Sequence, residues 1–385
     1  MTIGQLLPAD EGFCHQIPDT FASVVASDPS WTEKVCAMAA ARDGSLQLGF
    51  GLGKYANRNV IDAYAGISRG VEQVTVRASR RLAPQPDLTV IGPIRYEVLE
   101  PMRSVRFALD ANDTQPIAFD WVFESVVPPF LEDRTRTRAG FRVSSDLVRY
   151  HQIGLASGWV EIDGDRTEIT PEGWVSTRDH SWGVRYDVGL PPTDTEPFDM
   201  LATPGVSFRM IWSPIAMERP DGSRYALMMH YQIVHAPGYM TKKVMGGVEY
   251  PDGRMDEWTD LQPELGFDPV NRRLRGGVVH ATTADGTTRP LEIEVVSDTG
   301  FQLGAGLYFG FDGHHHGEWR GALHVDGERI ADCSTPDAAR RLHQIRDTVV
   351  HVVDPVGGGE GWGNCQPIIT GRDDDIGLDE ADSFI

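Results

Sequence analysis

Cysteine is scarce in this chain, with 4 residues among 385, and the four are scattered along the sequence. No two of them stand at the spacing of metal ligands, and a disulfide framework is usually denser. No apolar run approaches the length that spans a bilayer, and the first residues lack the basic and apolar regions of a secretion signal. Together these absences favour a reduced, soluble, cytoplasmic protein that does not insert into membranes.

Positive charge is also in short supply, because 35 Lys and Arg residues stand against 56 Asp and Glu residues, for a formal net charge of -21. Such a surface repels nucleic acid and anionic membranes, so phosphate-binding partners are disfavoured. The phosphate-binding Gly-Lys-Ser/Thr loop, the dinucleotide fingerprint and the Gly-x-Ser-x-Gly nucleophile elbow are all missing. The plainest role of the acidic surface is to keep the protein soluble.

What the chain has in abundance is Asp-Gly pairs between segments of alternating polarity. Asp and Gly tolerate the positive φ that tight hairpin turns require. The pairs stand at residues 43–44, 163–164, 221–222, 252–253, 285–286, 312–313 and 326–327. The alternating segments include residues 94–99, 105–109, 117–124, 158–162, 291–296 and 321–325. This pattern predicts an all-β fold of antiparallel barrels or sandwiches rather than βαβ units.

Few segments favour a helix. Residues 30–33 resemble a capping box that starts a helix toward Arg42, and Thr335 followed by Pro336 predicts a short helix over residues 338–345. The glycine-rich residues 49–53 lack a strand–turn–helix context, so they are interpreted as a strand edge or a loop of small residues.

The chain divides into two strand-rich halves. We expect an N-terminal β-domain over residues 1–165, a C-terminal β-domain over residues 166–370, and a loose acidic tail over residues 371–385. The Pro-rich residues 190–197 predict an exposed loop or a lid.

One polar stretch interrupts the apolar pattern, Arg178-Asp179-His180-Ser181-Trp182-Gly183-Val184-Arg185. In a strand, His180 and Trp182 would share one face, and Asp179 would lie on the other. Histidine can carry a proton near neutral pH, and tryptophan offers an apolar surface that attracts cations. We therefore expect His180 and Trp182 to line a common water-poor cavity. The alternative is a structural site in which Asp179 and Arg185 form an ion pair and Trp182 fills a core.

On these residues the sequence resembles the carotenoid 1,2-hydratase (hydroxyneurosporene synthase) superfamily, which includes AttH-like proteins, kievitone hydratase and fungal lipocalin-like Diels–Alderases. The motif of residues 178–185 carries most of the resemblance. Weaker support comes from residues 92–96, Pro101, Arg106, residues 316–321 and residues 361–363.

The resemblance implies two lipocalin-like β-domains packed together around a large apolar cavity. It also implies acid chemistry on an isoprenoid, polyketide or polyphenolic ligand, without a metal or a cofactor. An acid would protonate a double bond, Trp182 would stabilise the cation, and water would capture it. The further aspartate that carotenoid hydratases use on a following strand has no counterpart in residues 206–213.

The sequence therefore favours an enzyme, a hydratase-type lyase or an isomerase, that uses general acid–base catalysis on a hydrophobic terpenoid, steroid or aromatic molecule. His180 and Asp179 would carry protons, and Arg185 would orient the acid or a polar ligand group. Candidate ligand-binding residues, several of which would equally suit a core, are Trp182, Trp121, Trp212, His230, Tyr231 and His316. No cofactor and no metal ligand are assigned, the expected partner is the hydrophobic ligand, and a homodimer is left open.

Two alternatives remain at this point. The first is a lipocalin-like carrier that binds an apolar ligand without changing it. The second is a cupin-like, metal-dependent oxygenase, because His314, His316 and Glu318 would share one face of a strand. The glycines on both sides of this histidine run favour a turn instead.

Overall fold

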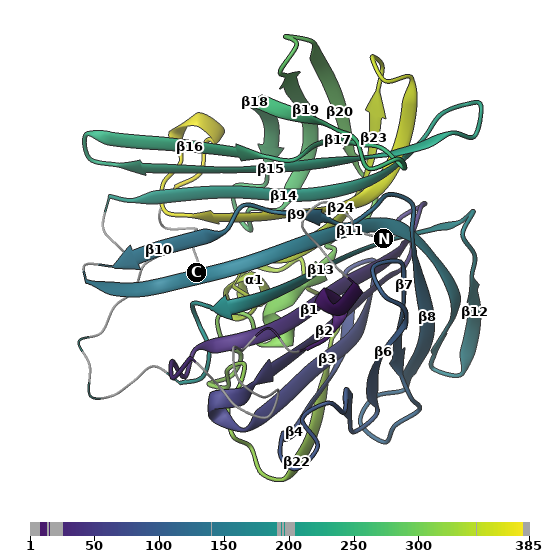
Figure 1. Ribbon diagram of the computed structural model, residues 1–385, viewed down its shortest axis with the longest axis vertical. Helices are drawn as coiled ribbons and strands as arrows, with labels where there is room; N and C mark the ends of the chain where they lie inside the picture. Colours follow the sequence, from purple (N-terminus) through teal and green to yellow (C-terminus); the bar gives the residue numbers. More distant parts are fainter. Residues whose placement is uncertain are drawn as a thin grey trace.

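The computed structural model describes residues 8–13, 15, 26–139, 141–190, 194, 196, 205–343 and 345–379. These residues form almost entirely antiparallel strands, arranged in two strongly curved, barrel-like sheets that pack against each other (Figure 1). The predicted all-β fold of two packed antiparallel units is confirmed.

The first sheet has the strand order β22-β4-β3-β2-β1-β13-β11-β8-β7-β6-β5, and β9, β10 and β12 pair with β11. Its strands are β1 (Trp31–Ala41), β2 (Gln47–Tyr55), β3 (Val60–Arg69), β4 (Glu72–Arg81), β5 (Val90–Ile91), β6 (Ile94–Glu100), β7 (Ser104–Leu109), β8 (Ile117–Ser125), β9 (Phe130–Leu131), β10 (Thr135–Ala139), β11 (Arg142–Ile162), β12 (Asp165–Ile169), β13 (Trp174–Val184) and β22 (Leu323–Ile330).

The second sheet runs β14-β24-β23-β20-β19-β18-β17-β15 and closes on itself, because β15 also pairs with β14. In addition, β16 pairs with β15, and β21 pairs with β23. Its strands are β14 (Ser207–Glu218), β15 (Arg224–Ala236), β16 (Tyr239–Met245), β17 (Gly247–Glu249), β18 (Met255–Phe267), β19 (Leu274–Thr283), β20 (Thr288–Val295), β21 (Phe301–Gln302), β23 (Arg346–Asp354) and β24 (Gly359–Thr370).

Helical segments are short. A short helix follows Thr335 as predicted, but α1 spans Pro336–Arg341 rather than residues 338–345. The Thr335 hydroxyl caps it by accepting a hydrogen bond from the backbone N–H of Ala338 at 3.2 Å. The 3-10 turns are η1 (Pro8–Glu11), η2 (Ala56–Arg58), η3 (Leu303–Gly306) and η4 (Asp374–Ile376). Within the described parts of the chain, no helix is long and apolar enough to cross a membrane.

The helix predicted from residue 30 toward Arg42 is wrong, because this segment forms β1. Strand β1 lies in the middle of the first sheet, pairs with β13 on one side and β2 on the other, and all its residues but one are buried. A strand covered on both faces suits small alanine side chains, and the pairing on both sides outweighs their helix propensity.

The glycine-rich residues 49–53 lie in β2, an inner strand, rather than in a loop or at a sheet edge. Gly49, Gly51 and Gly53 leave room for aromatic rings that lie flat on this strand. A Cβ atom at Gly51 would stand 2.2 Å from a ring carbon of Tyr64, and one at Gly49 would stand 2.6 Å from the ring of Phe301. The glycines therefore serve packing, because a ring occupies the place of each missing side chain.

The passage between the two sheets differs from the predicted boundary at residues 165 and 166. Strand β13, which carries the polar motif, pairs with β1 and β11 of the first sheet. The chain enters the second sheet at Ser207 and later returns to the first through β22. Within β22 lies the pair at residues 326–327, which is therefore not a hairpin turn.

The acidic C-terminal residues are attached to the second sheet as far as the structure describes them. Asp373 lies 3.5 Å from Arg209 of β14, and Leu378 is buried. The prediction of a loose tail is wrong for residues 371–379. Of the Pro-rich segment 190–197, the structure describes residues 190, 194 and 196, so the predicted loop or lid lies mostly outside the described residues.

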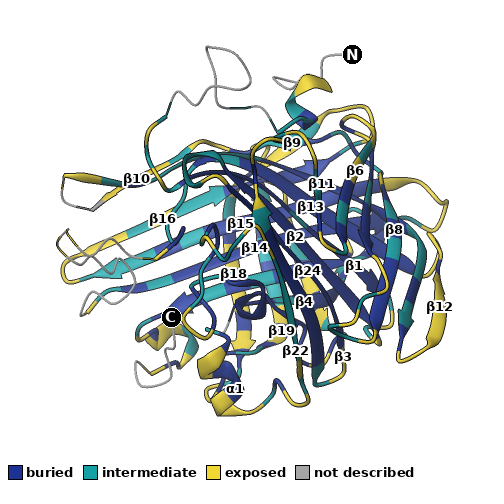
Figure 2. Ribbon diagram, turned by 90° about the horizontal axis from the view of Figure 1, so that it is seen from below, coloured by how far each residue is buried: buried dark blue, intermediate teal, exposed yellow. Residues whose placement is uncertain are grey.

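Each sheet encloses an apolar core of its own, and a third, smaller cluster joins the two sheets. That cluster brings Met38 and Val175 of the first sheet against Ala216 and Val349 of the second. Figure 2 shows that burial is deepest in the central strands β1, β2 and β13 and lowest in outlying hairpins such as β12. We call the region between β1, β11 and β13 on one side and β14, β23 and β24 on the other the inter-sheet layer.

Candidate functional site

The polar motif lies on β13, where its side chains alternate between two environments. Arg178 lies inside the first sheet, with its guanidinium carbon 5.6 Å from the centre of the buried Phe123 ring. Thr177 faces the inter-sheet layer, where its hydroxyl donates to Asn364 of β24 at 2.6 Å. His180 therefore lies inside the first sheet with Arg178, and Asp179 lies on the inter-sheet face, as the alternation predicts.

His180 is fully buried, and both of its ring nitrogens are engaged. Nδ1 lies 3.0 Å from the Tyr150 hydroxyl, and Nε2 lies 3.1 Å from Oε1 of Glu33. The Trp182 ring meets His180 edge-on at 5.8 Å between ring centres, and the His15 ring stacks on Trp182 at 3.6 Å. The expected imidazole–indole pair exists, but protein groups occupy both nitrogens that a ligand would need.

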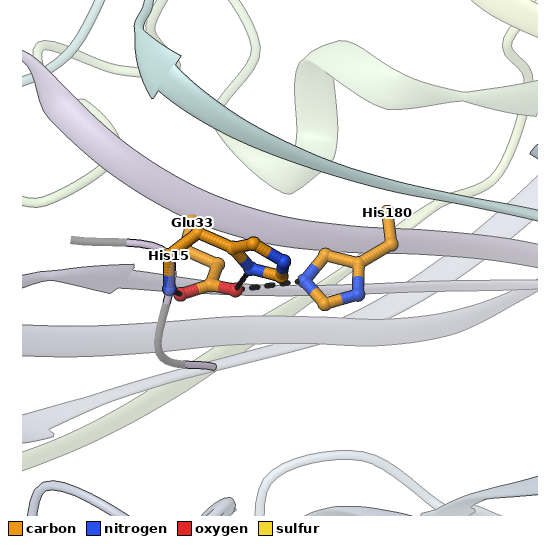
Figure 3. Close-up of side chains that lie close together, drawn as sticks. All are labelled: His15, Glu33 and His180. Atoms are coloured by element: carbon orange, nitrogen blue, oxygen red, sulfur yellow. Dashed lines mark hydrogen bonds and ion pairs between the residues drawn. The ribbon is translucent and has the colours of Figure 1, made fainter. Parts of the chain in front are cut away.

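Glu33 of β1 lies between two histidine rings (Figure 3). Its Oε1 is 2.6 Å from Nδ1 of His15 and 3.1 Å from Nε2 of His180. Burial opposes the charged form of Glu33, but the hydrogen bonds from the two imidazoles outweigh it and lower the pKa of this carboxyl. Burial likewise opposes the charged form of His15, and its bond to Glu33 outweighs it and raises the pKa of the ring.

The N-terminal segment completes this cluster through Glu11 of η1. Its carboxylate lies 2.7 Å from the Arg178 guanidinium and accepts hydrogen bonds from the hydroxyls of Tyr150 at 3.0 Å and Tyr96 at 3.1 Å. The backbone N–H of Met102 donates to it at 2.7 Å. Burial alone would raise the pKa of Glu11, but Arg178 outweighs it and lowers the pKa to about 2. Glu11 therefore neutralises the buried Arg178.

On the inter-sheet face, strand register brings Cys36, Asp179 and His151 side by side. Asp179 lies 3.8 Å from the guanidinium of Arg149, and Arg185 donates to the Ser181 hydroxyl on the same face at 2.6 Å. Burial raises the pKa of Asp179 even though Arg149 and Arg185 oppose the shift.

The predicted catalytic set of His180, Asp179 and Arg185 is thus divided by the strand itself. Asp179 and Arg185 belong to the inter-sheet face, whereas His180 points into the first sheet. One substrate cannot contact His180 and Asp179 together across an intact strand.

Lys34, Cys36 and Tyr308 form the next part of the inter-sheet face. The Tyr308 hydroxyl is 2.6 Å from Sγ of Cys36, and Nζ of Lys34 lies 3.8 Å from the centre of the Tyr308 ring. Nζ of Lys34 also lies 2.7 Å from Nε2 of His316. Burial lowers the pKa of Lys34 to about 8, and burial together with the Lys34 charge lowers the pKa of His316 to about 4.

The second sheet adds a carboxyl group, Asp347 of β23. Its Oδ1 accepts a hydrogen bond from Nδ2 of Asn364 at 2.9 Å, and Oδ1 of Asn364 accepts one from Thr177 of the first sheet. Burial raises the pKa of Asp347 to about 7; the charge of Asp179 adds to this, and the hydrogen bond from Asn364 opposes it. The pKa of Asp347 therefore lies close to neutral pH.

Several of these groups keep some exposed surface although they lie between the two sheets. Cys36 is the one residue of β1 that is not fully buried, although β1 is a central strand. Asp347 and Tyr308 are also half-buried, and so are Phe208, Phe309 and Ile368, which border small apolar clusters. We call Lys34, Cys36, Asp179, Tyr308 and Asp347 the inter-sheet cluster.

Besides Trp182 and His316, the predicted ligand-binding residues fall into two groups. Trp212 and His230 lie in the inter-sheet layer around Glu132, which accepts a hydrogen bond from Nε1 of Trp212 at 2.9 Å and lies 3.7 Å from Nδ1 of His230. Trp121 and Tyr231 are instead fully buried in the apolar cores of the first and second sheets. A ligand in the inter-sheet layer would therefore meet the first pair and not the second.

The histidine run at residues 314–316 lies in a loop between two turns, and an isolated bridge between Phe311 and His314 closes the first of them. Its three rings diverge and have three different partners: Glu318 for His314 at 3.0 Å, Asp187 for His315 at 3.2 Å, and Lys34 for His316 at 2.7 Å. The ligand set expected for a cupin-like oxygenase does not assemble here. Among the described residues, the side chains that could share a metal ion are instead His15, Glu33 and His180.

Sequence reasoning missed Glu11, Glu33, Tyr150 and Asp347. Glu33 was interpreted as a helix-capping acid, and the other three have no motif around them. One signal was available, because Glu33 is followed by Lys34 in a segment that is otherwise apolar as far as residue 41. Two adjacent charges in a buried strand indicate partners on both faces of the sheet.

Solved structures with a similar overall arrangement include proteins of the kind that the sequence resemblance named. A protein of Nitrosomonas europaea assigned as an AttH is 12% identical, with a TM-score of 0.45 over 88% of this chain and 91% of that chain. CghA, determined with Sch210972, is 12% identical, with a TM-score of 0.47 over 88% of each chain. Kievitone hydratase from Nectria haematococca is 8% identical, with a TM-score of 0.42 over 93% of this chain and 96% of that chain.

At these identities the likeness concerns the fold alone. No curated protein matches the sequence of this chain. One family matches residues 6–379, which span both sheets and the attached C-terminal segment. The chain therefore belongs to the family of unknown function DUF8625.

Proposed function

We propose that this protein is an enzyme that protonates a double bond of a hydrophobic small molecule in the inter-sheet layer, and so acts as a hydratase or an isomerase. The observation that carries the proposal is Asp347. Its carboxyl group has a pKa of about 7 and is half-buried, and Asp347 is the register partner of Phe301, whose apolar cluster is bordered by half-buried Tyr308 and Phe309. General acids work best when their pKa is close to the working pH.

Hydration or isomerisation of an alkene needs a general acid that first donates a proton and later accepts one. The Asp347 carboxyl would give its proton to one alkene carbon and leave a carbocation on the other. Asp179 lies close enough to act on Asp347 electrostatically, and its carboxylate would stabilise that positive charge. Loss of a proton from an adjacent carbon to Asp347 gives an isomer. Addition of water, with loss of its proton to Asp347, gives an alcohol.

The groups around the carboxyl pair would hold the ligand. The rings of Tyr308 and Trp212 offer apolar faces, and Arg185 and Lys34 offer positive charge to a polar end of the molecule. His180 would act as a positioning residue, because it holds β13 to β1 and β11 from inside the first sheet. A terpenoid, steroid or aromatic alkene suits such a mixture of apolar and charged surface.

The direct test compares wild type with Asp347→Asn, which keeps the shape and removes the acid. The proteins are incubated in D2O with a panel of terpenoid and polyphenolic alkenes, and products are followed by mass spectrometry. We expect wild type to incorporate deuterium at carbon, and Asp347→Asn to lose roughly 10²- to 10⁴-fold in rate, the usual contribution of a general acid. Asp298→Asn, at an exposed aspartate paired with Arg273, is the matched control and keeps full activity.

Two results would contradict the proposal. Equal rates for Asp347→Asn and wild type would remove Asp347 from the mechanism. Alkenes that bind to wild type but are recovered intact and unlabelled after long incubation would identify a carrier of apolar ligands instead.

A further inference from the structure

We infer that His15, Glu33 and His180 form a binding site for a divalent transition-metal ion of the zinc type, which fastens the N-terminal segment to the first sheet. The three side chains come from the N-terminal segment, β1 and β13, and they meet inside the first sheet (Figure 3). This is the opposite face of β13 from the inter-sheet cluster, so the inference does not depend on the proposed function.

The donor atoms are already gathered at metal-site spacing. Oε1 of Glu33 is 2.6 Å from Nδ1 of His15 and 3.1 Å from Nε2 of His180, and all three donors lie within 4.8 Å of one another. Donors bound to a tetrahedral zinc ion at ~2.0–2.1 Å stand roughly 3.3 Å apart. To accept an ion, the His15–Glu33 donor pair would widen from 2.6 Å by roughly 0.7 Å, and the His180–Glu33 pair from 3.1 Å by roughly 0.2 Å.

The second ring nitrogen of each histidine is held by a partner, as in known metal sites. Nε2 of His15 lies 3.1 Å from a carboxylate oxygen of Asp10, which leaves Nδ1 directed at Glu33. Nδ1 of His180 lies 3.0 Å from the Tyr150 hydroxyl, which leaves Nε2 directed at Glu33. Such outer partners fix the tautomer and the orientation of metal-binding imidazoles.

Hydrogen-bond counting also favours an ion. His15 has a carboxylate oxygen at each ring nitrogen, Glu33 at one and Asp10 at the other. His180 has Glu33 at Nε2 and, at Nδ1, the oxygen of Tyr150, whose own proton goes to Glu11. A neutral imidazole carries one N–H, so a neutral His15 ring cannot donate to both of these carboxylates, whereas an ion at Nδ1 would leave its one N–H for Asp10.

The donor set selects the class of ion. Two imidazoles and one carboxylate suit zinc, cobalt, nickel, copper or ferrous iron, whereas calcium and magnesium prefer oxygen ligands throughout. The site is enclosed, because the side chains of Glu33 and His180 have no exposed surface and that of His15 is 12% exposed. Stacking on Trp182 orients the His15 ring toward the site.

The test measures metal binding by the full-length, untagged chain. We expect elemental analysis to find about one zinc ion per chain after zinc loading and dialysis. Cobalt loading should produce the visible absorption bands of a low-coordinate nitrogen and oxygen site. Hydrogen exchange of residues 8–13 should slow when zinc is added, because the ion ties His15 to the sheet.

Three variants separate this site from adventitious binding. His15→Ala, at the most accessible ligand, and Glu33→Gln should each lose the bound ion and the cobalt bands. His15→Ala keeps the test valid if loss of the buried Glu33 charge prevents folding. His314→Ala, at a half-buried histidine of the 314–316 run, is the control and should keep the ion.

Two outcomes would overturn the inference. One is wild-type protein that binds no stoichiometric zinc or cobalt under these conditions. The other is bound metal that His314→Ala removes and His15→Ala leaves in place.

Discussion

Glu11 shows how one residue can hold a long-range network together. Its carboxylate accepts hydrogen bonds from the Arg178 guanidinium, from the hydroxyls of Tyr96 and Tyr150, and from the backbone N–H of Met102. These four donors come from different places in the sequence. A buried guanidinium without a carboxylate would be strongly destabilising, so Glu11 makes Arg178 tolerable inside the first sheet.

The stability of the fold should therefore depend on Glu11 in acid. Its pKa falls from an ordinary 4.5 to about 2 on folding, so the carboxylate stabilises the protein above pH 4.5, and this contribution is lost as the pH falls toward 2. The shift corresponds to about 3 kcal/mol. Glu11→Gln should lower the free energy of unfolding by about that amount at pH 7, and the gap to wild type should shrink at pH 3.

Urea denaturation at a series of pH values measures both effects. Glu97→Gln, at an exposed glutamate, is the control and should track wild type throughout. A gap between Glu11→Gln and wild type that stays constant from pH 7 to pH 3 would show that the charge of Glu11 is not what stabilises the fold.

At the scale of elements, β13 separates two kinds of chemistry. On its inner face, His180 has a hydrogen-bond partner at each ring nitrogen. On its outer face, Asp179 belongs to the inter-sheet cluster and lies near Arg149. A strand can separate two sites in this way because the side chains of neighbouring residues point to opposite faces of the sheet. The polar motif is thus one segment that serves two sites.

The glycines of strand β2 leave space for aromatic rings that pack against it. At Gly51 an added Cβ would stand 2.2 Å from the Tyr64 ring, whose hydroxyl lies 3.8 Å from Sγ of Cys36 in the inter-sheet cluster. Gly51→Ala should displace this ring and cost roughly 1–3 kcal/mol of stability, the usual cost of overpacking a core.

Thermal unfolding checks this prediction. Gly173→Ala is a suitable control, because Gly173 is exposed and its added Cβ would find its nearest neighbour at 3.5 Å, an ordinary contact. If Gly51→Ala were as stable as this control, the glycine would not be needed for the aromatic packing.

At the scale of the whole molecule, the two sheets are tied together by the path of the chain. After building most of the second sheet, the chain returns to add β22 to the edge of the first and then goes back to add β23 and β24. Along the chain, the last strand of the first sheet, β22, therefore comes before the strands β23 and β24 that close the second sheet. We expect this connection to link the stabilities of the two sheets.

The ion pair between Asp326 of β22 and Arg77 of β4 tests this link. The two residues are register partners, and Nε of Arg77 donates to Oδ1 of Asp326 at 2.7 Å. Because Arg77 is buried, Asp326→Ala should destabilise the protein by roughly 2 kcal/mol. The loss should appear in both sheets when hydrogen exchange is followed strand by strand.

Asp332→Ala, at an exposed aspartate beyond the end of β22, provides the comparison and should have little effect. Faster exchange confined to β22 and β4 in Asp326→Ala would show that the two sheets unfold independently.

The sequence by itself determined the all-β class, several of the hairpins and the two faces of β13. Each of these depends on local patterns: Asp-Gly turns between β1 and β2 or between β19 and β20, and alternation at residues 117–124 and 178–184. Only the tertiary structure decided that residues 31–41 form a strand, because pairing on both sides outweighs their helix propensity. It also decided the partners of the motif, because Glu11, Glu33 and Asp347 reach β13 from distant parts of the chain, and a local pattern does not show which distant side chains will meet.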